Sequence, residues 1–196
     1  MPIEVHRRGT TGWLRSVTYV QDVYRGIYGS TIRPNPDISV TSTERNNVIN
    51  MVAGVTFNSV DSPIFAQNYF DVEITDLINE DLEVPLETPQ IAEIGPLAAI
   101  GGGVAKTPFL DHLLNYAGIK EAVFTVTPRL ASALIRSGRT MRYLGKASSN
   151  RLSQNVQDEW GSYYEYNPVV LSTPVIAGKV DAEASSSAFI TEAVKG

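Results

Sequence analysis

Most regular patterns in this chain are short apolar segments of alternating character, separated by glycine, proline and asparagine. This pattern is typical of strands, which we predict within residues 13–28, 47–60, 69–74, 123–127, 140–144, 162–166 and 169–176. Helical spacing is clear only at 107–118, where a threonine and a proline precede the apolar face and a glycine follows it. Since strands outnumber helices, the sequence predicts a mainly β fold (α+β to a minor degree), a β-sandwich or barrel with one or two flanking helices and extended arms.

Two further segments leave their type open. Residues 129–136 have apolar positions that suit a second helix, and residues 90–100 fit either a short helix or a buried strand. With 196 residues and 43% hydrophobic content, the chain can bury one core. We therefore expect an N-terminal arm at 1–12, a single β-rich domain at 13–180 and a C-terminal arm or edge strand at 181–196. Within the domain we expect a long loop at 30–47 and an acidic loop at 75–88.

Composition excludes several classes of protein. The chain has no cysteine, which rules out disulfides, zinc–thiolate sites and cysteine nucleophiles. Its net charge of −5 argues against nucleic-acid binding as the main function, since such binding needs an excess of basic residues. No segment approaches the roughly 18 apolar residues of a membrane span, and no apolar segment follows the first charges, so we expect neither a membrane partner nor a secretory signal.

Charge is strongly segregated along the sequence. Residues 46–105 carry nine carboxylates and no lysine or arginine, whereas residues 106–151 carry eight basic residues and two acids. Such complementary segments can dock head-to-tail on other copies of the chain. Alternatively, each segment is simply a solvated face, because the fold can bring distant segments together.

The motifs that could carry chemistry fail on spacing. The glycine-rich segment at 101–107 ends in Lys-Thr like a phosphate-binding loop, but Ile100 and Ala105 stand where that loop needs glycine. Asp111 and His112 are adjacent on the predicted helix, so their side chains diverge by about 100°. The acidic loop lacks the spacing that converges oxygens on Ca²⁺. We therefore expect no enzyme activity, no catalytic residue, no metal and no cofactor.

Aromatic residues gather near the C-terminal end of the predicted domain, at Trp160, Tyr163, Tyr164 and Tyr166. We expect them to pack in a core or an interface. Stacking on sugars is the alternative, and it leaves open a carbohydrate- or calcium-dependent binding module.

Three segments together resemble the tail tube proteins of some tailed bacteriophages. In those proteins a small-residue stretch enters a short helix, a Tyr-Thr-Pro strand end follows, and a run with Arg-Gly-Thr and Gly-Lys-Ala comes later. The matching residues here are Gly101-Gly102-Gly103-Val104-Ala105-Lys106-Thr107-Pro108, then Phe124-Thr125-Val126-Thr127-Pro128, and Ser137-Gly138-Arg139-Thr140-Met141-Arg142-Tyr143-Leu144-Gly145-Lys146-Ala147. A Glu44-Arg45 pair matches loosely upstream.

The resemblance implies a virion structural protein, assembled in the cytoplasm of a bacterial host. Its β-sandwich or barrel subunits would form hexameric rings that stack into a tube, with other virion proteins as partners and DNA as passing, non-specific cargo. Carboxylates would line the lumen or an interface, namely Asp61, Asp71, Glu73, Asp76, Glu80, Asp81, Glu83 and Glu87. Basic residues would form the facing interface, namely Arg129, Arg136, Arg139, Arg142, Lys146 and Arg151.

The virion interpretation predicts how copies of the chain assemble. Reversing Arg139 and Arg142 to glutamate should block assembly and leave the monomer folded. A head–tail adaptor, a tail terminator or a capsid decoration protein would fit the same composition, and ring assembly without stacking would distinguish the first two from a tube.

Overall fold

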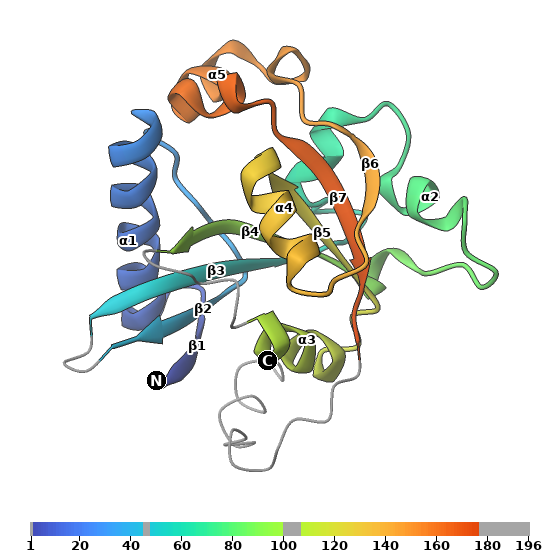
Figure 1. Cartoon of the computed structure of the whole chain (residues 1–196), viewed down its shortest axis with the longest axis horizontal. Coiled ribbons are helices and arrows are strands. Elements are labelled where there is room, and N and C mark those ends of the chain that lie inside the picture. Colours follow the sequence, from blue (N-terminus) through green and yellow to red (C-terminus); the bar gives the residue numbers. More distant parts are fainter. Residues whose placement is uncertain (1, 45–47, 100–106, 177–196) are drawn as a thin grey trace.

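Seven strands form one open, mixed sheet in a computed structural model that describes residues 2–44, 48–99 and 107–176 (Figure 1). Their order across the sheet is β1-β2-β3-β4-β5-β7-β6, and every neighbouring pair is antiparallel except β4 and β5. The strands are β1 (Ile3–Arg7), β2 (Ile38–Thr43), β3 (Ile49–Phe57), β4 (Ile91–Ala99), β5 (Glu121–Val126), β6 (Arg142–Lys146) and β7 (Val169–Pro174).

Helices cover both faces of this sheet. The α-helices are α1 (Thr11–Tyr28), α2 (Ile74–Asn79), α3 (Thr107–Tyr116), α4 (Pro128–Arg136) and α5 (Gln154–Trp160). Short 3₁₀ helices are η1 (Phe65–Tyr69), η2 (Thr88–Gln90), η4 (Ser149–Arg151) and η5 (Gly161–Tyr166). Apolar residues of α3 and α4 pack on one face, while α1, η1, α2 and η5 contribute to two clusters on the other. None of the described helices has the length and apolar character needed to cross a membrane.

The predicted β-sandwich or barrel is therefore wrong, and the largest single reason is α1. Residues 13–28 were expected to form a strand because β-branched and aromatic residues alternate there. The structure has an 18-residue helix instead, which buries Trp13, Ser16, Val20 and Tyr24 at spacings of three and four. Thr10 caps its start by accepting a hydrogen bond from the Trp13 amide, and Gly29 ends it at φ 64°.

Other local predictions divide between confirmed and wrong. The helices at 107–118 and 129–136 and the strands at 47–60, 123–127, 140–144 and 169–176 are confirmed within one to three residues. Within the segment 90–100, residues Ile91–Ala99 form the strand β4. The predicted strands at 69–74 and 162–166 are wrong, because residues 70–73 are a connection between η1 and α2 and residues 162–166 belong to η5.

Of the two expected arms, only the N-terminal one, from residue 2 onward, lies within the described residues. Residues Ile3–Arg7, expected to belong to a loose arm, form β1 and pair with β2 from Ile3 opposite Ser42 to Arg7 opposite Ile38. The expected C-terminal arm at 181–196 lies outside the described residues.

The parallel strands β4 and β5 separate part-way along their length. They pair over only three positions, from Ile91 opposite Glu121 to Glu93 opposite Val123. Beyond Glu93 both strands continue, to Ala99 and Val126, without pairing to each other in the described structure. The centre of the sheet is therefore split, and Glu93 lies where the split begins.

Candidate active site

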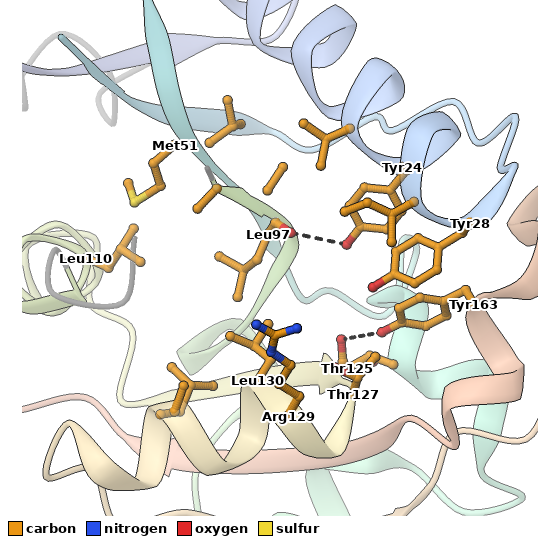
Figure 2. Close-up of a pocket in the computed structure, with 17 residues that line it drawn as sticks. Tyr24, Tyr28, Met51, Leu97, Leu110, Thr125, Thr127, Arg129, Leu130 and Tyr163 are labelled. Atoms are coloured by element: carbon orange, nitrogen blue, oxygen red, sulfur yellow. Dashed lines mark hydrogen bonds between the residues drawn. The ribbon is translucent and has the colours of Figure 1, made fainter. Parts of the chain in front are cut away.

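Two cavities lie at the split and share three lining residues. The first, which we call the split cavity, has a volume of about 480 Å³ and lies among α1, β3, β4, β5, α3 and α4 (Figure 2). The second, which we call the Glu93 cavity, has a volume of about 390 Å³ and includes the loop after α1, η1 and α5. Tyr24, Thr125 and Tyr163 line both, so the cavities meet at these side chains.

The split cavity is largely apolar. Its apolar lining consists of Val23, Ile27, Met51, Val52, Leu97, Ala98, Ala99, Leu110, Leu130, Ala133 and Leu134. Arg129, on the first turn of α4, extends into it and supplies a positive charge (Figure 2). An elongated apolar group with a polar or anionic end is the kind of ligand that such a lining suits.

Each of the two separated strands accepts a hydrogen bond from one tyrosine hydroxyl. Tyr24 Oη donates a hydrogen bond to the Leu97 carbonyl of β4 at 3.3 Å, and Tyr163 Oη donates one to the Thr125 carbonyl of β5 at 3.1 Å (Figure 2). Burial raises the pKa of Tyr163 well above its usual range, and it raises that of Tyr24 in the same direction. Both phenols therefore stay protonated and act as hydrogen-bond donors.

Glu93 is the titratable group at the centre of the site. It is 6% exposed; its Oε2 accepts a hydrogen bond from the Ala66 amide at 3.1 Å, and its Oε1 accepts one from Thr125 Oγ1 at 3.2 Å. Burial raises the pKa of Glu93 to about 7, although these hydrogen bonds and one from the Phe65 amide act to lower it. A carboxyl group with this pKa can take up and release a proton near neutral pH, which is what a general base requires.

The rest of the Glu93 cavity combines aromatic faces with charged groups. Phe65, Trp160 and Tyr163 line it, and the Trp160 and Tyr163 ring centroids are 4.9 Å apart. Packing of Trp160, Tyr163 and Tyr164 in the interior agrees with the prediction made for these aromatics, whereas Tyr166 is half exposed. Arg33 and Glu159 add opposite charges to the same wall.

The carboxylates that the sequence singled out lie elsewhere. All eight, Asp61, Asp71, Glu73, Asp76, Glu80, Asp81, Glu83 and Glu87, are exposed, and none lines either cavity. The segregated charges instead pair partly within one chain. Arg151 forms two hydrogen bonds with Asp71, at 2.5 and 2.6 Å, and Arg142 lies 3.4 Å from Asp81.

The basic residues that the sequence singled out are scattered. Arg129 lines the split cavity, Arg136 and Lys146 are exposed, and Arg139 is buried against Asp111. Whether any of the exposed residues contacts a second copy of the chain stays a prediction. The Asp111 side chain accepts hydrogen bonds from Arg139. No group of three His, Asp or Glu in the described structure is arranged to hold a metal ion. The glycine-rich segment lies largely outside the described residues.

Sequence reasoning missed Glu93, Tyr24, Arg33 and the split itself. One signal for Glu93 was present, because it is the single carboxylate within the apolar segment Ile91–Ala99. Charged residues are almost never buried without partners or a function. An isolated carboxylate in an otherwise apolar strand was therefore a better candidate than any member of the acidic loop.

Comparison with known proteins identifies relatives of this fold. A family model described as "Thermostable hemolysin" matches residues 6–179. The structure is similar to that of the AHL synthase LasI, at 15% identity over 90% of each chain with a TM-score of 0.58. It is also similar to FeeM, an N-acyl amino acid synthase from uncultured soil microbes, at 8% identity over 89% of this chain and 94% of that one, with a TM-score of 0.58.

A third solved structure is of the CoA-dependent acyl-homoserine lactone synthase BjaI with SAM and isopentyl-CoA. It is 10% identical over 89% of this chain and 83% of that one, with a TM-score of 0.57. At these identities the likeness shows the fold. No curated protein matches the chain significantly in sequence.

These findings correct the functional interpretation made from the sequence. The resemblance to tail tube proteins is wrong, and so are the virion location, the virion partners, the DNA cargo and the stacked rings. The prediction that the chain is not an enzyme is also wrong, since the similar structures named above are synthases. The matching segments misled because they consist of helix caps, turns and strand ends, and many unrelated folds need the same small residues at such positions.

Proposed function

The chain belongs to the thermostable hemolysin family and has the fold of solved acyl-homoserine lactone and N-acyl amino acid synthases, and from this premise we propose that it is an acyltransferase. It moves an acyl group from a thioester to an amine. The observation that carries the proposal is Glu93, a buried carboxyl group at the start of the split between β4 and β5, in the wall of one of two adjoining cavities.

The split cavity is the site for the acyl donor. Parallel strands that separate turn backbone N–H and C=O groups toward each other, and these groups can pair with amides of an extended ligand. The arm of a CoA-type thioester contains such amides, and the cavity's apolar lining suits an acyl chain. Arg129 gives the cavity a cation for the anionic part of the donor.

The Glu93 cavity is the site for the amine. A protonated amine has no lone pair, so it becomes a nucleophile only after losing a proton, which the Glu93 carboxylate accepts. The nitrogen then attacks the thioester carbonyl at the junction of the cavities, near Thr125. The C–N bond forms and the C–S bond breaks. Overall the ammonium nitrogen gives up two protons; one ends on the leaving thiol and the other passes through Glu93 to solvent.

The volume of the split cavity sets the acyl chains that the protein accepts. Ala133 of α4 lines this cavity and is partly buried. We expect Ala133→Phe to lower kcat/KM for long-chain acyl-CoA by about 10-fold or more and to leave short-chain acyl-CoA unaffected, since single methylenes in such pockets change discrimination by about 10- to 200-fold. Thiol release measures the rate, and because the chain has no cysteine, a thiol reagent detects only the product.

Ser132→Phe is the matched control, because Ser132 neighbours Ala133 on the same helix, is exposed and lines neither cavity. It should leave the chain-length profile unchanged. An equal loss of activity on acetyl-CoA and long-chain acyl-CoA in Ala133→Phe would contradict the placement of the acyl chain.

A further inference from the structure

The loop after α1 places an arginine on the wall of the Glu93 cavity. The Thr31 amide donates a hydrogen bond to the Glu159 carbonyl at 2.7 Å, and Ser30 Oγ donates one to the same carbonyl at 2.8 Å. Ile32, the next residue, is 5% exposed and belongs to the core cluster around α1. With its backbone held in this way on the end of α5, the loop presents Arg33 to the cavity.

The Arg33 guanidinium has no partner within the part of the chain that the structure describes. Four other arginines form ion pairs with carboxylates there: Arg8 with Asp37, Arg25 with Asp22, Arg139 with Asp111 and Arg151 with Asp71. Arg33 makes no hydrogen bond and no ion pair with the described residues, even though Glu159 is among the residues that line the same cavity. Its five N–H donors are therefore free to bind an incoming anion, and a guanidinium matches a carboxylate with two parallel hydrogen bonds.

Opposite charges thus line one small cavity, with Glu93 buried in its wall and Arg33 exposed. We propose that the acyl acceptor is an α-amino acid or a closely similar zwitterion, whose amine lies at Glu93 and whose carboxylate binds Arg33. This inference rests on the proposed function and specifies its substrate class. The cavity volume of about 390 Å³ lies near the lower end of the range for ligand pockets, roughly 300–1,000 Å³, and therefore suits a small metabolite.

The remaining lining adds further selectivity. Asn35 and Asn68 supply amide groups, and Phe65 and Trp160 supply aromatic faces for the side group of the acceptor. Two acidic residues, Glu93 and Glu159, and one arginine line this cavity, so a second carboxylate on the acceptor is repelled. Acceptors with no net charge are favoured over acidic amino acids.

Binding to the full-length protein tests the acceptor class without requiring turnover. Wild-type protein, Arg33→Gln and Arg136→Gln are titrated calorimetrically with neutral L-amino acids and with the amines left when their carboxylates are removed. Arg136 is the matched control, because it is exposed on the last turn of α4 and lines neither cavity. We expect Arg33→Gln to weaken amino-acid binding by about 10- to 100-fold, since hydrogen bonds to charged groups contribute about 1.5–3 kcal/mol.

The same substitution should leave binding of the carboxylate-free amines unchanged, and Arg136→Gln should change neither. Equal binding of amino acids and amines to the wild type, no detectable binding of either, or equal losses in the two variants would overturn the inference. Acyl transfer to amines measured separately distinguishes the two proposals. Transfer that is equally fast to both acceptor classes and insensitive to Arg33→Gln overturns the acceptor class alone, whereas no transfer to any amine overturns the proposed function.

Discussion

Glu93→Gln should lower kcat/KM for acyl transfer by about 10²- to 10⁴-fold, the usual contribution of a general base. The amide keeps the shape of the side chain and can still meet Thr125 Oγ1, but it cannot accept a proton from the amine. Steady-state thiol release measures the loss. An undiminished kcat/KM would exclude Glu93 as the base.

The pH profile provides an independent signature of the same group. Burial raises the pKa of Glu93 to about 7, and the base must be deprotonated to act, so wild-type kcat/KM should rise as pH increases from about 6 to 8. In Glu93→Gln that rise should disappear, leaving only the titration of the amine itself. Glu121→Gln is the matched control, because Glu121 is a 3% exposed carboxylate on the adjoining strand that lines neither cavity. It should retain the wild-type profile.

Asp111→Ala should lower the free energy of unfolding by about 3–5 kcal/mol, because it leaves a buried guanidinium without its carboxylate. Asp111 of α3 accepts two hydrogen bonds from Arg139, at 3.1 and 2.5 Å, and the two side chains are only 11% and 7% exposed. The pair ties α3 to the turn after α4, and both helices line the split cavity. Urea denaturation followed by circular dichroism measures the change.

Asp71→Ala is the control for this comparison. It removes a carboxylate with equally short hydrogen bonds to Arg151, but that pair lies in solvent, where ion pairs contribute little. A loss of stability as large as that of Asp111→Ala would contradict the role given to burial. The same reasoning changes the expectation for Arg139→Glu, which would put a second buried carboxylate against Asp111 and unfold the monomer.

Local signals predicted the elements whose ends are marked in the sequence. A proline near the start and a glycine after the end mark α3, apolar spacing marks α4, and the apolar character of β3, β5 and β7 identifies them as strands. The prediction for α1 failed because its β-branched and aromatic residues favour a strand. Tertiary packing on β3 and β4 overrides that preference.

The site could not be predicted because it depends on contacts between segments far apart in the chain. Tyr24, Glu93, Thr125 and Tyr163 come from four different elements and meet only where β4 and β5 separate. The point at which two parallel strands stop pairing has no signature in the local sequence. Charge segregation was visible, but the sequence did not show that some of these charges pair within one chain, as Arg151 does with Asp71.

Mixing wild-type protein with long-chain acyl-CoA and a neutral amino acid tests the acyltransferase proposal most directly. We predict that free thiol and N-acyl amino acid, followed by a thiol reagent and by mass spectrometry, appear in equal amounts and only when the amino acid is present. Thiol release accompanied by free fatty acid, or no release above the rate without protein, would contradict acyl transfer at the split between β4 and β5.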